Sequence, residues 1–75
     1  MKLRKIKTNM TEISINGKTV FFSYNTPVAG YDDNGAFRTD QSFSRTTSKH
    51  ITQYFDGNKN IAREVPQSYI ESLVQ

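Results

Sequence analysis

The sequence predicts a small α+β domain: a hairpin meander of antiparallel β-strands with one or two short helices packed on one face. Two observations favour this class. In the first half, runs that alternate apolar and polar residues flank turn dipeptides such as Asn16-Gly17, which is typical of β-hairpins. From Thr46 or Thr47 onward, apolar residues recur three and four positions apart, which indicates helix. We therefore expect the strands first and the helices after them.

The clearest hairpin is formed by 11–15 and 18–24. Asn16 and Gly17 suit a type I′ turn because both of its central residues take positive φ. With these two residues in the loop, Ile13 lies opposite Val20, and one face becomes apolar. That face, which we assign to the core, carries Ile13, Ile15, Val20 and Phe22. Phe21 points to the other face, and we expect something to cover it there.

Further strands are predicted on both sides of this hairpin. Residues 3–8 form either an edge strand or a loose basic arm. Proline at Pro27 interrupts the second strand, because it cannot donate a ladder hydrogen bond, and an extended segment resumes at 28–31. The run 32–35 reads as a turn and leads into a short strand at 36–39.

The C-terminal half contains the helices. The first has one apolar stripe and is capped at its end by Gly57; the stripe consists of Thr47, Ile51, Tyr54 and Phe55. The second begins near Pro66 and carries Tyr69, Ile70 and Leu73 on one face. Between the helices, 61–65 forms either an edge strand or a loop.

Composition limits the organisation of the chain. Seventy-five residues allow a single domain, 1–75. The sequence has no cysteine, so a tight core, a partner or self-association as a homodimer must supply the stability that disulfides give other small folds. The lack of cysteine fits a reducing cytoplasm, and no apolar run reaches the roughly 20 residues of a membrane span. We expect a cytoplasmic protein without a membrane partner.

The charge balance indicates classes of partner. The formal charge is +3 and the isoelectric point is about 9.4. This excess permits contact with nucleic acid, an acidic protein surface or anionic lipid. It argues against a protein that mimics DNA, which would be strongly acidic.

The run Ser44–Ile51 is the candidate site, because it places hydroxyls, two cations and the single histidine at a helix start. The hydroxyls serve as an N-cap on one reading. On the other, the free N–H groups and the cations receive a phosphate or carboxylate. The residues predicted to bind an anion or nucleic acid are Arg45, Thr46, Thr47, Ser48, Lys49 and His50, together with Arg38.

Two segments of the chain, 23–29 and 44–51, resemble a family of small phage- and prophage-encoded proteins of unknown function. The motifs that carry the resemblance are Ser-Tyr-Asn-Thr-Pro-Val-Ala and Ser-Arg-Thr-Thr-Ser-Lys-His-Ile. The resemblance implies a mobile-element context. It transfers no residue with a known role.

The sequence gives little support to catalysis. It has no cysteine and one histidine, and its seven carboxylates are scattered. A triad of Ser44 or Ser48 with His50 and Asp56 is conceivable, but no nucleophile-elbow pattern surrounds either serine. No pattern of metal ligands or nucleotide-binding glycines is present either, so we expect no metal and no cofactor.

The sequence therefore predicts a phage-type accessory protein that acts by binding and is not an enzyme. Its basic helix start would contact nucleic acid or an acidic partner. The alternative is a protein that inhibits or modulates a host defence or replication protein through its surface. A continuous basic stripe would favour nucleic acid, and an exposed aromatic patch rimmed by charge would favour a protein partner.

Overall fold

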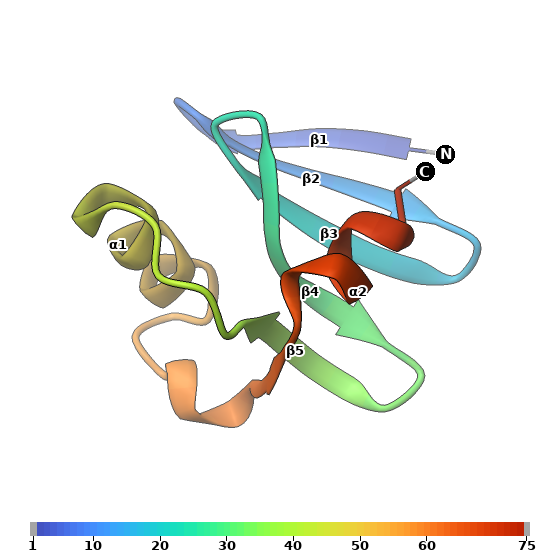
Figure 1. Ribbon diagram of the computed structural model, residues 1–75. Helices are drawn as coiled ribbons and strands as arrows, with labels where there is room; N and C mark the ends of the chain where they lie inside the picture. Colours follow the sequence, from blue (N-terminus) through green and yellow to red (C-terminus); the bar gives the residue numbers. More distant parts are fainter. Residues whose placement is uncertain (1, 75) are drawn as a thin grey trace.

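The computed structural model describes residues 2–74, and for Lys2 and Lys59 the backbone only. A mixed sheet and two α-helices form the described part (Figure 1). The strands are β1 (Lys2–Lys7), β2 (Met10–Ile15), β3 (Lys18–Ser23), β4 (Thr26–Asp32), β5 (Gly35–Thr39) and β6 (Arg63–Val65). The helices are α1 (Arg45–Tyr54), a short 3₁₀ turn η1 (Lys59–Ile61) and α2 (Gln67–Ser72).

The sheet has six strands in the order β1-β2-β3-β4-β5-β6. Neighbours from β1 to β5 are antiparallel, so the predicted meander is confirmed. The last pair is parallel, because the chain leaves β5, passes through α1 and η1, and returns to lay β6 beside β5. The two segments left open by the sequence are thus both strands: the N-terminal one is the edge strand β1, and 63–65 is the opposite edge.

The predicted register of the first hairpin is confirmed. Ile13 lies opposite Val20, as expected for a two-residue Asn16-Gly17 loop with positive φ at both positions. Pro27 does not end the strand as expected. It lies inside β4 opposite Phe22, next to a register shift that absorbs the irregularity, and its carbonyl accepts a hydrogen bond of 2.7 Å from the Gln67 side chain.

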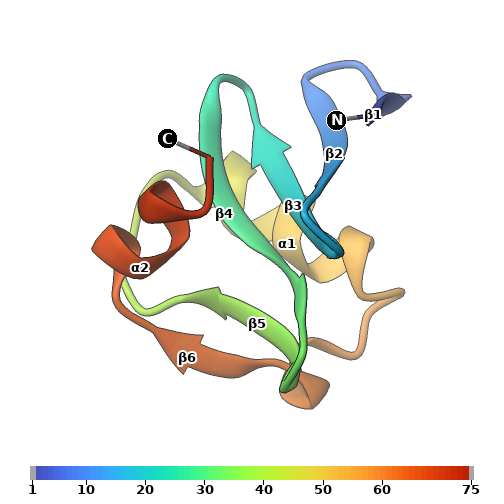
Figure 2. The same cartoon turned by 90° about the vertical axis from the view of Figure 1, so that its right-hand side faces the viewer.

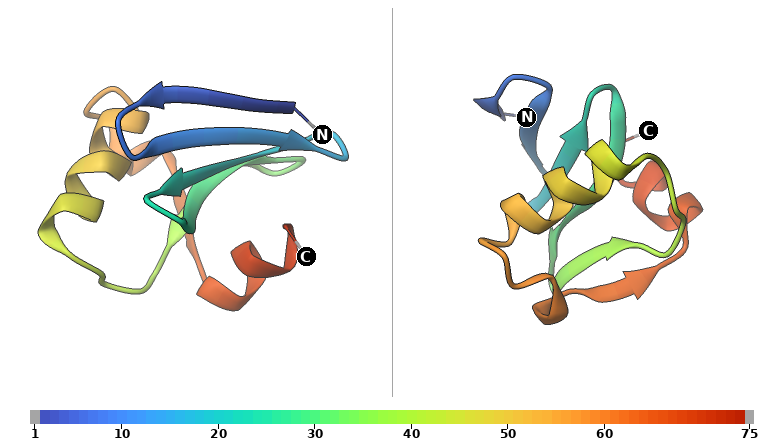
Figure 3. Two further views of the ribbon diagram at one scale, coloured as in Figure 1. Left: turned by 90° about the horizontal axis from the view of Figure 1, so that it is seen from above. Right: turned by 90° about the vertical axis from the view of Figure 1, so that its left-hand side faces the viewer.

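The two helices cover opposite faces of the sheet, which corrects the prediction that helices pack on one face. Val20 and Phe21 are adjacent in β3, so their side chains point to opposite faces, and both are fully buried. Phe21 belongs to the cluster that includes Ile51 of α1, and Val20 to the cluster that includes Ile70 of α2. Figure 2 and both views of Figure 3 show the sheet curling between the helices. Both faces of the central strands are apolar and therefore need a cover.

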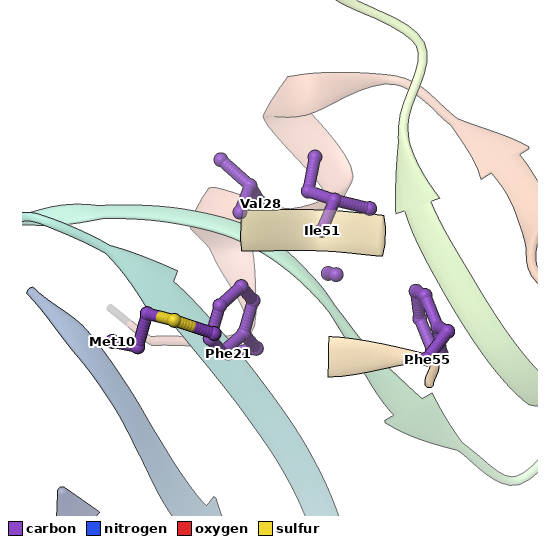
Figure 4. Close-up of a cluster of buried hydrophobic side chains, with 6 residues drawn as sticks. Met10, Phe21, Val28, Ile51 and Phe55 are labelled. Atoms are coloured by element: carbon purple, nitrogen blue, oxygen red, sulfur yellow. The ribbon is translucent and has the colours of Figure 1, made fainter. Parts of the chain in front are cut away.

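The first cluster lies between the sheet and α1 (Figure 4). It consists of Met10, Phe21, Val28, Ala29, Ile51 and Phe55. The expectation that Phe21 is covered is confirmed, because its ring stacks on that of Tyr54 with centroids 4.3 Å apart. The apolar stripe predicted for the first helix is thus the face that contacts the sheet.

The second cluster lies under α2 and joins the two halves of the chain. It consists of Ile13, Val20, Phe37, Val65 and Ile70. The Phe37 ring lies against Gly30, where an added Cβ would come within 2.9 Å of the ring and 2.0 Å of the Thr19 carbonyl oxygen. The strand β4 therefore needs glycine at this position.

Helix α1 ends one residue earlier than predicted. The N–H of Gly57 donates to the carbonyl of Thr52, and that of Asp56 to Gln53, which is the Schellman pattern. In this pattern the left-handed position falls on Asp56, whose φ is 54°. Gly57 follows it with φ 82°. The predicted cap at Gly57 is thus shifted by one residue, onto an aspartate.

A buried carboxylate ties α2 and β6 to the turn between β4 and β5. Asp32, whose side chain is 2% exposed, accepts hydrogen bonds from Arg63 at 2.6 Å, from the Tyr69 hydroxyl and from the Asn34 N–H. The hydrogen bond from Arg63 does most to hold the pKa of Asp32 down at about 2. The run 32–35 is therefore a turn, as predicted, and also an anchor for the C-terminal segment.

Candidate functional site: the exposed face of α1 and the hollows beside it

The helix starts within the predicted run, at Arg45 and thus one or two residues before the position that the spacing indicated, and one of its hydroxyls forms a cap. Ser44 is the N-cap residue, and its Oγ accepts a hydrogen bond of 3.1 Å from the N–H of Thr47. Arg45 is the first helical residue, and Lys49 follows one turn later. The capping function expected for this run is therefore present.

Arg45 and Lys49 are exposed on α1. Among the described side chains, the ion pairs join Arg4 to Glu12, Arg38 to Glu64 and Arg63 to Asp32, and include neither of these two cations. The first turn of α1 contains no acidic residue. The helix therefore presents two uncompensated positive charges close to the positive end of its own dipole.

Two of the predicted site residues point inward instead. Thr47 is buried against the sheet, and His50 is partly buried. The Nδ1 atom of His50 lies 2.7 Å from the Oγ of Ser23, a side chain in β3 that is almost fully buried. Neither residue can therefore belong to the exposed cationic face, and both instead attach α1 to the sheet.

His50 ends a chain of hydroxyls that runs back to the N-cap. The Oγ of Ser23 lies 3.3 Å from the Oγ1 of Thr47, which lies 3.2 Å from the Oγ of Ser44. With hydrogen on Nε2 of His50 only, each hydroxyl donates toward the histidine; with Nδ1 protonated, each donates away from it. Every hydroxyl keeps a partner in both states. The hydroxyl that reaches His50 is thus the buried Ser23, and neither Ser44 nor Ser48 forms the conceivable triad.

Arg38 lies on β5. It donates a hydrogen bond of 2.6 Å to Glu64 on β6. With Ser48 it lines a hollow of about 190 Å³, into which Asp40 and Glu64 also bring negative charge. The structure therefore pairs Arg38 with a carboxylate, which sets it apart in charge from Arg45 and Lys49.

A larger hollow, of about 420 Å³, lies between the C-terminal half of α1 and the hairpin β1–β2. Within it, Glu12 accepts a hydrogen bond of 2.6 Å from the Tyr54 hydroxyl and pairs with Arg4 at 3.0 Å. Burial, followed by the hydrogen bond to Glu12, raises the pKa of Tyr54 far above its usual value, so the phenol stays protonated. Sequence reasoning missed this group. The signal was available, because a β1 strand in register places Arg4 directly opposite Glu12.

This hollow connects the two basic segments of the chain. Lys7 at the end of β1 and Gln53 of α1 both line it. Lys49 lies one helical turn before Gln53 on the same side of α1. The cations thus follow one another along the helix and onto β1, although Asp56 and Glu12 also reach the hollow.

Within the described residues, no group of three or more His, Cys, Asp and Glu side chains is arranged to hold a metal ion. No described helix is long and apolar enough to cross a membrane.

The comparison with known families places the chain. Residues 1–72 match the sequence model of a family described as a family of unknown function (DUF8033). The chain belongs to this family. No curated protein and no solved structure matches it. The family gives no activity, so functional inference for this member of DUF8033 depends on the geometry of its own surface.

Proposed function

We propose that the protein acts by binding and that the exposed face of α1 contacts a phosphate-bearing partner, with nucleic acid as the first candidate. The observation that carries this proposal is the pair of exposed cations Arg45 and Lys49, which belong to none of the ion pairs among the described side chains. Lys7, on the rim of the adjacent hollow, extends the positive face. Cations that remain free of carboxylate partners are available to neutralise phosphates.

The stability of α1 does not explain the presence of these two charges. Two cations four residues apart repel one another, and a cation in the first turn opposes the helix dipole. The arrangement lowers the stability of α1, and an anionic partner would turn the same charges into favourable contacts. This trade of stability for binding is common at functional surfaces.

The continuity of the basic residues favours nucleic acid over a compact acidic protein. A polyanion can follow cations that run from Arg45 through Lys49 to Lys7, whereas base-specific readout would need further groups. We therefore propose contact with the phosphate backbone and no preference for sequence. Arg38 is left out of this proposed surface because Glu64 neutralises it.

The test is a binding titration of labelled single- and double-stranded DNA and RNA at salt concentrations from about 50 mM to about 500 mM. We expect affinity to fall steeply with salt, and the double variant Arg45→Glu, Lys49→Glu to lose binding. The matched control is Lys18→Glu, because Lys18 lies at the β2–β3 turn. Each single reversal changes the net charge equally, so the comparison of Lys49→Glu with Lys18→Glu separates site from total charge.

Two results would contradict the proposal. One is the absence of binding at the lowest salt concentration. The other is an equal loss of affinity in Lys49→Glu and Lys18→Glu, which would mean that only the overall charge matters. In the first case an acidic protein surface becomes the next partner to test on the same face.

A further inference from the structure

The free side of β1 is an edge of the sheet. This strand is the terminal one in the sheet order and is paired with β2 alone. The left view of Figure 3 shows no other described element along its outer side. In a β-strand, the N–H and C=O groups of alternate residues point to one edge, so β1 offers a row of unpaired donors and acceptors.

Hollows flank this edge on both faces of the sheet. On the α1 face, Arg4, Ile6 and Lys7 line the hollow of about 420 Å³. On the opposite face, Leu3 borders a second hollow of about 240 Å³. Its other lining residues are Thr11, Ile13, Phe22, Tyr24 and Asn25. Leu3 is 67% exposed, which makes it an apolar contact without a cover in the described structure. A strand added to β1 would extend alternate side chains toward the two hollows.

The charge of the edge indicates which strand it would accept. Glu12 neutralises Arg4, but Lys5 and Lys7 are exposed and belong to none of the ion pairs among the described side chains. If a second copy paired its own β1 antiparallel to this one about Lys5, the two Lys5 side chains would lie directly opposite each other, which is destabilising. An acidic strand would instead bring opposite charges together.

We propose that the free edge of β1 binds an extended acidic segment of a partner protein by β-strand addition. The segment combines acidic residues, placed beside Lys5 or beside Arg4 and Lys7, with apolar residues over the hollow on the other face. Lysines on an edge strand also discourage aggregation. Protection alone does not account for hollows on both sides of the strand. This site meets the proposed nucleic-acid surface at Lys7 and at the hollow of about 420 Å³. The strand edge itself is distinct from the exposed face of α1, and the proposal does not rest on nucleic-acid binding.

The test uses a peptide of about six residues that alternates glutamate and valine, since this length matches β1. In either register its glutamates lie on one face and its valines on the other. The readout is amide hydrogen exchange of ¹⁵N-labelled protein. We expect the outward-pointing amides of β1, which exchange freely in the unbound protein, to be slowed by about tenfold or more by the peptide.

Three controls make the result specific. A peptide that alternates lysine and valine should not protect β1. Two glutamate–valine peptides, one N-methylated at the glutamate amides and the other at the valine amides, should differ, because only one of these sets of amides donates to β1 and its methylation should abolish binding. Lys5→Glu should weaken peptide binding about fivefold or more, whereas Lys49→Glu, with the same change in net charge, should alter it by less than about twofold. Lys5→Glu should leave nucleic-acid binding through α1 in place, so failure of one proposal is distinguishable from failure of the other.

Three outcomes would overturn the inference. One is unchanged exchange of the outward β1 amides when about 1 mM peptide is added to the folded native protein. Another is equal binding of the acidic and basic peptides. The third is protection that rises with protein concentration in the absence of peptide, because the edge would then be occupied by a second copy of the chain.

Discussion

Reversal of the charge at Arg45 should stabilise the protein, although the same change removes a residue from the proposed binding face. In the native chain, Arg45 opposes the dipole at the first position of α1, and Lys49 repels it from one turn away. In Arg45→Glu, the new carboxylate would favour the dipole and attract Lys49. Each dipole contribution is about 0.3–1 kcal/mol, and each charge pair about 0.2–0.5 kcal/mol.

The reversal removes one unfavourable contribution of each kind and adds one favourable one, so the gain in the free energy of unfolding at low salt is about 1–3 kcal/mol. For a domain of this size, each kcal/mol corresponds to about 4–8 °C in the melting temperature. Thermal unfolding followed by circular dichroism at low and high salt measures the gain. Arg45→Gln, which removes the unfavourable charge without adding a favourable one, should give about half the effect.

The reasoning would be refuted if Arg45→Glu lowered the melting temperature at low salt, or if its gain did not shrink as salt screened the charges. The contrast with binding is what makes the variant informative. If Arg45 served only folding, reversal of its charge should not raise the stability of the protein. A gain in stability together with a loss of nucleic-acid affinity would identify Arg45 as a residue that serves binding.

Three further predictions concern the fold. Gly30→Ala should destabilise the protein by about 3 kcal/mol or more, measured by urea unfolding, because the new Cβ would lie 2.0 Å from the Thr19 carbonyl oxygen. Asp56→Gly should raise the melting temperature, with a gain of about 0.5–1 kcal/mol, because glycine takes the left-handed φ of 54° without strain. Folding holds the pKa of Asp32 at about 2 instead of 3.8, so its ionised form stabilises the protein above pH 3.8 and this contribution is lost as the pH falls toward 2. After a discount for the 36% exposure of Arg63, Asp32→Asn should cost about 1–2 kcal/mol near neutral pH and flatten the stability profile between these two pH values.

The fold was predictable where short-range chemistry decides it. The Asn16-Gly17 turn specified both the loop length and the pairing of Ile13 with Val20, because a two-residue loop leaves only one register. The helical stripe ending in Phe55 followed from spacing alone. The α+β class followed from these two patterns together.

The relative placement of the helices was not predictable in the same way. The sequence alternates between polar and apolar residues over 12–15, which suggests one apolar face. Val20 and Phe21, however, are consecutive apolar residues and need cover on both faces. Which helix reaches which face depends on the curl of the sheet and on the crossover through α1, and neither has a local signature. The parallel pairing of β6 has the same origin.

The candidate site was predictable in position but not in composition. A hydroxyl cap and the cations were predicted at the helix start, although the sequence left four hydroxyls open as the cap and the structure selects Ser44. The inward turn of His50 depends on Ser23, which is 27 positions away in sequence. The pairing of Arg38 with Glu64 likewise requires β5 and β6 to be neighbours. Contacts with distant segments therefore decide which residues of the run Ser44–Ile51 are exposed and which are turned toward the sheet.

Local choices that cost folding free energy gather around α1. Arg45 and Lys49 repel one another at its start, and Asp56 takes a left-handed conformation at its end. Tyr24, a bulky residue with φ of 58°, lies beside it with its ring 5.6 Å from that of His50. A sequence selected only to fold would agree with its local preferences, and departures are expected at functional sites. The sheet and α2 obey those preferences more closely, apart from the turn residues Asn9 and Asn16, for which positive φ is ordinary. The left-handed φ of Tyr24 thus adds to the repulsion between Arg45 and Lys49 in supporting the choice of α1 as the first surface to test.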